Sequence, residues 1–196
     1  MIAAIMQPTF LPWLGYFKLI NSVDVFVFLD DVQFNKRSWQ QRNKILFNNK
    51  TQYLTVPIFS KGKFFQKINE VSIDETTDWR KNHLKTIELS YKKKTHFDEI
   101  FNILNDIYHR KDNSLSITNI SFIESILNYL DIKTKVMFSS DLKASGKKEE
   151  KIISILKIIN VKRYLSPFGS KSYIGNGEKF SKNKINLNYF SFTHPK

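Results

Sequence analysis

The residues best suited to chemistry lie together, directly after a short apolar segment near the N-terminus. Residues 25–30 read VFVFLD, and a second acid, Asp31, and a polar run follow them. Ligands of α/β proteins bind outside the carboxyl ends of parallel strands, so a dense polar cluster at such an end predicts a ligand site. The members of the run that we expect to bind substrate are Gln33, Lys36, Arg37, Trp39, Arg42 and Asn43.

The two acids at the end of this segment are expected to take different roles. Successive side chains of a strand point to opposite faces, so Asp30 and Asp31 cannot both enter one pocket while the strand continues. A carboxylate there can take a proton from an attacking amine, hold a ribose hydroxyl or bind Mg²⁺. We predict that Asp31, which lies farther out, is catalytic and that Asp30 is structural. In the alternative, one acid caps the loop and the other pairs with Arg37 or Arg42.

The basic residues of the polar run suit an anionic ligand. Arg37 and Arg42 have the fork geometry that chelates a pyrophosphate, and Trp39 can stack on a base or cover a sugar. A charge run is more often a solvated loop, but the Trp, Gln and Asn residues mixed into this one favour a binding surface.

An earlier turn, bracketed by Pro8 and Pro12, leads into Trp13-Leu14-Gly15-Tyr16. In the nucleotidyltransferase class of Rossmann-like proteins, a His-x-Gly-His signature occupies this place, and its Gly lets a nucleotide base lie against the helix. Trp13 and Tyr16 replace the histidines, which argues against nucleotidyl transfer, whereas Gly15 would still leave room for a ring. The alternative is that Trp13 and Tyr16 pack on the sheet.

Two later segments carry weaker signals. On a helix, Trp79 and His83 would lie one turn apart, and His83 would suit a general base, although a lone His is more often a structural hydrogen-bonder. After an apolar segment, the loop with Gly169, Lys171 and Tyr173 could hold phosphates, or it is an ordinary connection. The histidines at 96, 109 and 194 lack metal-ligand spacing, so we predict no zinc site.

Composition restricts the class of protein. The chain has 196 residues, 41% of them hydrophobic, and no Cys, which predicts a single globular domain without disulfides or thiolate metal sites. Its net charge is +13, but only five of the 31 basic residues are Arg, and the spread Lys residues favour a solvated surface over nucleic-acid binding. We find no signal peptide and no membrane-spanning segment, and expect a cytoplasmic protein.

Apolar periodicity predicts the elements that position these residues. Short buried strands are expected at 2–7 and 25–30, joined by a helix from Pro12 to Asn21, which makes a right-handed βαβ unit. The other predicted elements are strands at 52–58, 68–73, 135–138, 162–166 and 187–192 and helices at 78–92, 96–110, 116–131 and 148–159. This order predicts an α/β, Rossmann-like three-layer domain over 1–196, with a helical middle segment at about 78–131.

The motifs resemble those of the WbqC-like family, bacterial proteins found in gene clusters for O-antigen and related surface polysaccharides. The first block is long and specific, and the later ones occur in the expected order nearly to the end of the chain. The matching residues are Gln7–Phe17, Asp24–Phe28, Asp30–Phe34, Lys36–Trp39, Arg42, Asn43, Leu54–Pro57, Asp78, Trp79, His83, Ser90–Lys93, Phe97, Tyr164–Ser166, Gly169, Lys171 and Tyr173.

The resemblance implies an acyl- or aminoacyl-transferase, for example of glycine, that acts on a nucleotide-linked amino sugar in lipopolysaccharide biosynthesis. Asp31 or His83 would take the proton from the amine. The residues implied to bind the substrate are Gln7, Trp13, Gly15, Tyr16, Gln33, Lys36, Arg37, Trp39, Arg42, Asn43, Gly169, Lys171 and Tyr173. The acyl donor stays open.

Two other classes of function remain as alternatives. One is a nucleotidyltransferase or ATP-dependent ligase of the same superfold, for which Mg²⁺ would be the cofactor. The other is a non-enzymatic nucleic-acid-binding module, which would bind DNA or RNA with a steep salt dependence.

Overall fold

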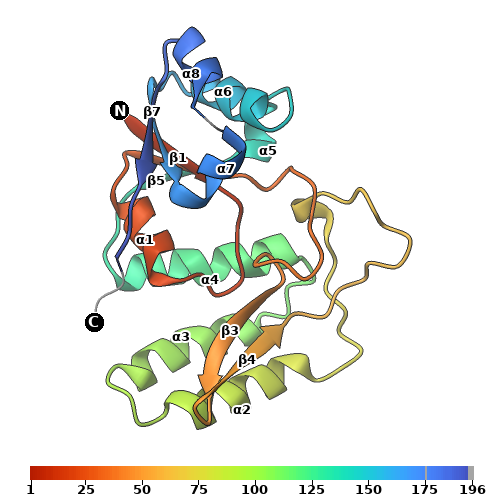
Figure 1. Cartoon of the computed structure of the whole chain (residues 1–196). Coiled ribbons are helices and arrows are strands. Elements are labelled where there is room, and N and C mark those ends of the chain that lie inside the picture. The colour runs from red at the N-terminus through yellow and green to blue at the C-terminus, as the bar shows by residue number, and fades with distance from the viewer. Residues whose placement is uncertain (175, 194–196) are drawn as a thin grey trace. The chain divides into compact units, whose positions relative to one another are not determined.

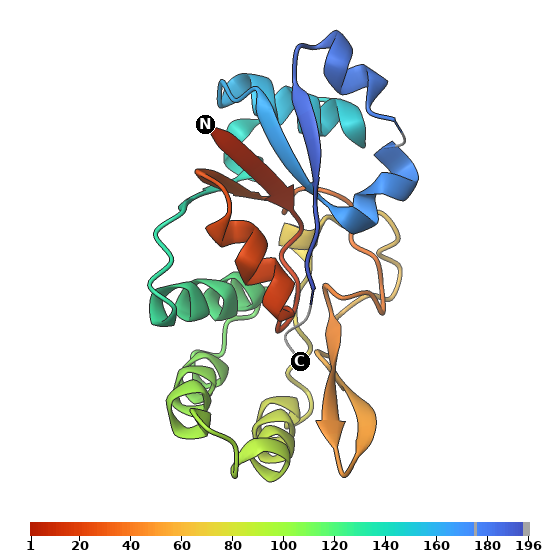
Figure 2. The same ribbon diagram turned by 60° about the vertical axis from the view of Figure 1, so that its left-hand side comes forward.

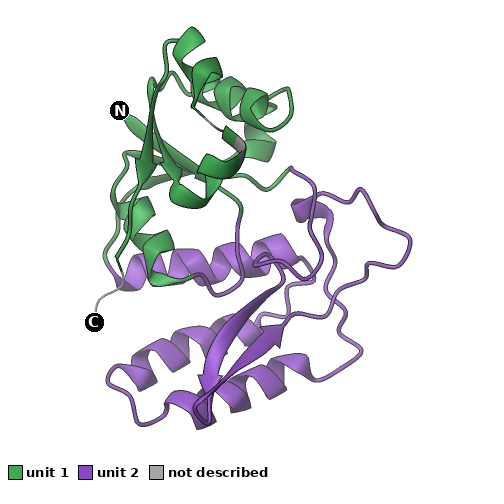
Figure 3. Cartoon of the chain, in the orientation of Figure 1, with its two compact units in different colours: residues 1–7, 13–31, 131–196 green, residues 8–12, 32–130 purple. Residues whose placement is uncertain are grey.

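The computed structural model describes residues 1–174 and 176–193, except for the side chain of Tyr173. The contacts within the chain divide it into two compact units (Figure 3). Unit 1 comprises Met1–Gln7, Trp13–Asp31 and Asp131–Lys196, and unit 2 comprises Pro8–Pro12 and Val32–Leu130. Our expectation of a single domain with an insert at 78–131 stays a prediction.

Unit 1 is built on a five-stranded parallel sheet (Figure 1). Its strands are β1 (Ile2–Met6), β2 (Val25–Phe28), β5 (Lys135–Phe138), β6 (Arg163–Pro167) and β7 (Asn186–Phe190). The order across the sheet is β5-β2-β1-β6-β7, and every neighbouring pair is parallel. The chain therefore builds outward from β1 first to one side and then to the other, which is the doubly wound order of Rossmann-like folds.

Helices cover both faces of this sheet, as its sequence pattern requires. All four residues of β2 are buried. Phe26 packs edge-on against Tyr16 of α1 (Leu14–Asn21), with ring centroids 5.6 Å apart. Val25 and Val27, which face the other way, join Ile155 of α6 (Glu149–Ile158) in a second core. The α/β, Rossmann-like three-layer fold predicted from the sequence is thus confirmed.

Short helices complete unit 1. The segment after β5 forms α5 (Ser139–Leu142), and the segment after β6 forms a 3₁₀ turn, η2 (Phe168–Ser170), followed by α7 (Lys171–Ile174) and α8 (Glu178–Lys182). Helices α7 and α8 lie in the segment after β6, where a loop was predicted, whereas no element was predicted for the residues of α5.

Unit 2 is mostly helical and carries one hairpin. Its helices are α2 (Trp79–Tyr91), α3 (Phe97–His109) and α4 (Leu115–Tyr129), which match the three helices predicted for the middle of the chain. Strands β3 (Arg42–Phe47) and β4 (Lys50–Thr55) pair antiparallel. Asn48 and Asn49 close this hairpin with φ of 49° and 59°, a conformation that Asn tolerates better than most residues.

The structure corrects two of the predicted strands. The segment 68–73 begins with a 3₁₀ turn, η1 (Ile68–Glu70), and contributes only isolated bridges, including one between Ile58 and Ile73. The strand predicted at 52–58 is β4, which begins and ends earlier and pairs with β3. Strand β3 was not predicted, because its first residues, Arg42 and Asn43, were assigned to a binding run.

Candidate functional site

The carboxyl edge of the parallel sheet in unit 1 has the geometry of a ligand site. Figure 2 shows the arrows of this sheet pointing to one edge. Strands β1 and β6 are neighbours there, although the chain leaves them toward opposite sides of the sheet. Such a switch point opens a crevice outside the strand ends. Gln7 follows β1 at this edge, and the segment beginning at Phe168 follows β6.

Asp30 is a structural acid at the end of β2. It is 5% exposed, and its carboxylate accepts hydrogen bonds from the Ser140 N–H at 3.0 Å and the Ser140 hydroxyl at 2.8 Å. Its own N–H donates to Ser139 Oγ at 3.1 Å. Asp30 therefore connects the end of β2 to the first turn of α5, and its purely structural role stays a prediction.

Asp31 forms an ion pair with a lysine that the sequence analysis did not single out. Lys151 Nζ lies 2.6 Å from Asp31 Oδ2, and the two side chains are only 11% and 14% exposed. Lys151 also donates to the carbonyl oxygen of Ala144 at 3.2 Å. The expected alternative partners, Arg37 and Arg42, belong to unit 2.

Ser139 lies between the two acids. Its side chain is fully buried, and its Oγ is 3.0 Å from Asp30 Oδ1 and also hydrogen-bonds Asp31 Oδ1. A hydroxyl carries one proton, so the two carboxylates share one donor. This sharing keeps the two acids and the start of α5 in one network.

The environment of Asp31 favours the ionised carboxylate. Burial by itself would raise its pKa, but the hydrogen bonds from Lys151 and Ser139 and the charge of Lys151 outweigh that effect and lower the pKa from 3.8. Asp31 is therefore an anion at neutral pH, able to accept hydrogen bonds from a ligand N–H group.

The first turn of α1 has a different arrangement from the one that the motif suggested. An added Cβ at Gly15 would lie 1.8 Å from the Trp13 ring, so the indole itself fills the space above the glycine. Trp13 is 44% exposed and packs edge-on against Phe192. Tyr16 is buried and donates to the Gln7 carbonyl oxygen at 3.0 Å, and burial raises its pKa well above 10.0. Gly15 thus accommodates a ring, and that ring is Trp13.

The segment after β6 places the exposed side chain of Lys171 next to a pair of hydrogen-bonded serines. Ser166 and Ser170 are buried and bonded to each other, with 2.6 Å between their Oγ atoms. Lys171 is exposed, and its Nζ lies 5.8 Å from the Phe168 ring centroid and 5.9 Å from that of Tyr189. An added Cβ at Gly169 would meet no atom within 4 Å. The two serines hold this segment together, and the role of exposed Lys171 in binding an anion stays a prediction.

Two of the predicted residues lie wholly or partly outside the described part of the chain. His194 is outside the described residues. The backbone of Tyr173 lies in α7, but its side chain is not described.

In unit 2, the predicted basic residues are accessible. Lys36, Arg37 and Trp39 are exposed, and Arg37 adopts φ of 59° while its N–H donates to Gln41 Oε1 at 2.9 Å. The guanidinium of Arg42 lies 4.2 Å from the ring centroid of Tyr53, a cation–π contact that orients it. Lys36 and Arg37 are thus exposed to an anionic ligand of unit 2, whereas Arg42 is half-buried beside Tyr53.

Several amides of the same run hold the backbone instead. Asn43 Nδ2 donates to the carbonyl oxygens of Phe10 and Leu11, at 3.2 and 2.6 Å. An amide from outside the run, that of fully buried Asn119 on α4, donates to the Gln40 carbonyl oxygen at 2.8 Å. Gln33, predicted to bind substrate, donates its amide to the Phe64 carbonyl oxygen at 3.1 Å. The density of amides in this run therefore reflects loop architecture as well as any ligand.

His83 lies in an aromatic core of unit 2. It is 7% exposed, contacts the rings of Phe10, Trp79 and Tyr108, and places Nδ1 3.1 Å from Tyr108 Oη. Burial lowers its pKa to about 4, against a smaller opposing effect of a hydrogen bond to the Thr55 backbone. A catalytic role for His83 stays a prediction, and it would require the ring to be uncovered.

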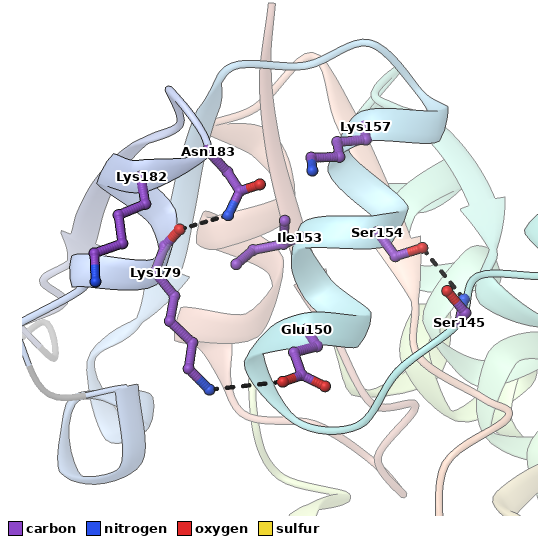
Figure 4. Close-up of a pocket in the computed structure, with 8 residues that line it drawn as sticks. All are labelled: Ser145, Glu150, Ile153, Ser154, Lys157, Lys179, Lys182 and Asn183. Carbon is purple, nitrogen blue, oxygen red and sulfur yellow. Dashed lines mark hydrogen bonds and ion pairs between the residues drawn. The ribbon is translucent and has the colours of Figure 1, made fainter.

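Each unit also has a cleft that the sequence analysis did not anticipate. In unit 1 a cleft of about 500 Å³ lies between α6 and α8. Figure 4 shows Lys179 reaching across it to Glu150. Lys179 Nζ is 3.1 Å from Glu149 as well, so its charge is already balanced. In unit 2 a cleft of about 800 Å³ runs along α2, where buried Arg80 pairs with Glu75 at 2.6 Å.

The described residues form neither a metal-binding cluster nor a membrane-spanning helix. In residues 1–174 and 176–193, no group of three or more His, Asp and Glu side chains is arranged to hold a metal ion. Within the same part of the chain, no helix is long and apolar enough to cross a membrane.

Comparisons with known proteins agree with the resemblance seen in the motifs. A protein of Mycobacterium tuberculosis (strain ATCC 25618 / H37Rv), described as uncharacterized protein Rv1507c, is 36% identical over 190 residues. The alignment covers 96% of this chain and 81% of the relative. No solved structure matches the chain. The WbqC-like protein family matches residues 7–196, and the chain belongs to this family.

Proposed function

We propose that this protein is an acyl- or aminoacyl-transferase that acts on a nucleotide-linked amino sugar. The observation that carries the proposal is the ionised Asp31, held by Lys151 and Ser139 at the carboxyl edge of a doubly wound parallel sheet. This edge is where such folds bind nucleotide-like ligands. The family resemblance to proteins of surface-polysaccharide gene clusters supplies the class of reaction.

Asp31 would act on the acceptor amine. In the transfer, the amine nitrogen bonds to the carbonyl carbon of the donor, the bond to the donor's leaving group breaks, and the nitrogen loses a proton. Because the pKa of Asp31 is lowered, we assign it mainly to holding and orienting the amine N–H, and to accepting the proton as the nitrogen becomes positive. Positioning of this kind can account for much of an enzyme's acceleration.

Accessible cations would hold the diphosphate. Within unit 1 our candidate is Lys171. Within unit 2, as a separate set, the candidates are Arg37 and Arg42, and Trp39 offers a flat apolar surface, 53% exposed, for a base or sugar. Arginine binds paired phosphate oxygens with two parallel N–H donors, which gives orientation as well as charge. The net charge of +13 would also steer an anionic substrate toward the protein.

Thermal unfolding with candidate ligands tests the binding part of the proposal. Nucleoside-diphosphate sugars should raise the melting temperature, because a ligand of the native state stabilises it, and free monosaccharides should raise it much less. Equal shifts with both kinds of ligand would contradict a diphosphate site. A search for a mass increase of the amino sugar, with activated glycine and other acyl donors, tests the transfer itself.

The strand order also favours a second candidate, a nucleotidyltransferase or ATP-dependent ligase, because the same topology binds nucleotides in those enzymes. The indole of Trp13 counts against it, since it fills the space above Gly15. Mg²⁺-dependent ATP binding by the purified protein would favour this candidate over the transferase.

A further inference from the structure

A loop of unit 2, residues 59–67, exposes aromatic side chains that are not part of the proposed site. Phe64 and Phe65 are 80% and 86% exposed, and Phe59 is 49% exposed. Phe64 and Phe65 are the most exposed large hydrophobic residues among those described. Leaving neighbouring rings in water is unfavourable, so the loop is suited to a surface that takes them up.

The loop is fixed at its base by hydrogen bonds rather than being a loose connection. On one side the Phe59 N–H donates to the Ser72 carbonyl oxygen at 3.0 Å. On the other side the Phe34 N–H donates to the Gln66 carbonyl oxygen at 2.8 Å, and the Gln33 amide holds the Phe64 carbonyl oxygen. Gly62 turns the tip with φ of 75°. The rings of Phe64 and Phe65 therefore lie on a loop that is hydrogen-bonded to the rest of unit 2 at both ends.

The charged residues of this loop all have one sign. Lys61, Lys63 and Lys67 are exposed, and the sequence from Pro57 to Asn69 contains no Asp or Glu. The next acid, Glu70, accepts a hydrogen bond from the Lys67 N–H at 2.9 Å. Aromatic rings flanked by lysines match the two layers of an anionic bilayer surface, because the rings enter the acyl boundary while the ammonium groups stay among the headgroups.

We propose that residues 59–67 dock this protein on an anionic lipid surface, with Phe64 and Phe65 inserted and the three lysines against the headgroups. A protein partner fits the observations less well, because lysine is depleted in protein–protein interfaces whereas anionic headgroups attract it. The proposal does not depend on the transferase activity, and it concerns a surface rather than the carboxyl edge of the sheet.

Co-sedimentation with vesicles tests the proposal. The intact chain should bind vesicles of phosphatidylcholine mixed with phosphatidylglycerol much more than vesicles of phosphatidylcholine alone, and salt should weaken the binding. Phe64→Ala/Phe65→Ala should lower the association constant by at least about ten-fold, because two rings no longer enter the bilayer. Leu89→Ala, which removes a side chain 53% exposed on α2, is the matched control and should change nothing.

The contribution of the lysines to vesicle binding is tested with a second pair of variants. Lys61→Glu/Lys63→Glu should lower binding to the mixed vesicles by about ten-fold or more, whereas Lys92→Glu/Lys93→Glu, with the same change in net charge at another exposed site, should have a much smaller effect. Equal losses from the two charge variants would mean that net charge alone attracts the vesicles, and would overturn the proposal. Absence of binding, or concentration-dependent self-association abolished by Phe64→Ala/Phe65→Ala, would also overturn it.

Discussion

Lys151 Nζ lies 2.6 Å from Asp31 Oδ2, and this pair joins the end of β2 to the first turns of α6. The residues are 120 positions apart in the sequence, and neither is fully buried. A charge pair of this kind stabilises the fold only modestly, because the cost of removing both ions from water offsets much of their attraction. The pair also keeps the Asp31 carboxylate ionised, at the edge of the sheet where a ligand would bind.

Replacing Asp31 separates a role in the reaction from a role in the fold. Asp31→Asn should lower the free energy of unfolding by about 1–3 kcal/mol, because Lys151 is left without its carboxylate. If Asp31 also positions the amine, turnover per folded molecule should fall by about 10²–10⁴-fold. Chemical denaturation and an assay under conditions in which the variant is fully folded measure the two effects independently.

Two further variants control this experiment. Asp31→Asn/Lys151→Met should recover part of the lost stability, because no unpaired charge remains, while turnover stays low. Asp30→Asn should destabilise the protein without changing turnover per folded molecule, since Asp30 serves Ser139 and Ser140. Loss of function in strict proportion to unfolding in Asp31→Asn would rule out the catalytic assignment.

Stability should depend on pH through Asp31. Its pKa is lowered in the folded state, so the unfolded chain binds the proton more readily. The contribution to stability is therefore complete above the unfolded value of 3.8, and it is lost as the pH falls through the lower, folded pKa. Urea unfolding at a series of acidic pH values should show a shallower decline for Asp31→Asn; identical slopes in both proteins would contradict the pairing.

Gly15 should resist substitution because of Trp13. Gly15→Ala would place Cβ against the indole, and displacing it should cost about 1–3 kcal/mol, more than the helix propensity gained, which is at most about 1 kcal/mol. The expected result is a lower melting temperature with altered tryptophan fluorescence. In a Trp13→Ala background the same substitution should be neutral or stabilising, and a destabilising effect there would refute the steric explanation.

The two arginines test the diphosphate contacts. Arg37→Lys and Arg42→Lys keep the charge but remove the bidentate fork, so each should weaken the binding of a nucleoside-diphosphate sugar. Stability should change by less than about 1 kcal/mol, because Arg37 is exposed and the substitution at Arg42 keeps a cation beside Tyr53. Calorimetric titration measures the affinity, and unchanged affinity in both variants would leave Arg37 and Arg42 as parts of a solvated loop.

The sequence by itself determined the elements whose apolar pattern is strong. The continuous apolar run of β2 and the three- and four-residue periodicity of α2, α3 and α4 were sufficient to predict them, because each must bury a defined face. The acids at the end of β2 were singled out because polar residues that follow a buried strand favour a ligand site in an α/β sheet, and their roles stay predictions. The segment 68–73 was mispredicted because a short apolar alternation also fits a turn packed on a core.

Tertiary structure alone decided which partners these residues have. Nothing in the pattern of α6 distinguishes Lys151 from Lys157, the other lysine of this helix, and Ser139 reads as an ordinary residue after a strand. They become neighbours of Asp31 only because β5 lies beside β2 and α6 packs on the sheet. Likewise, the glycine at position 15 predicts that another group packs closely against it, but only the structure shows that this group is the indole of Trp13. Contacts between distant segments depend on strand order and helix packing, which local periodicity does not encode.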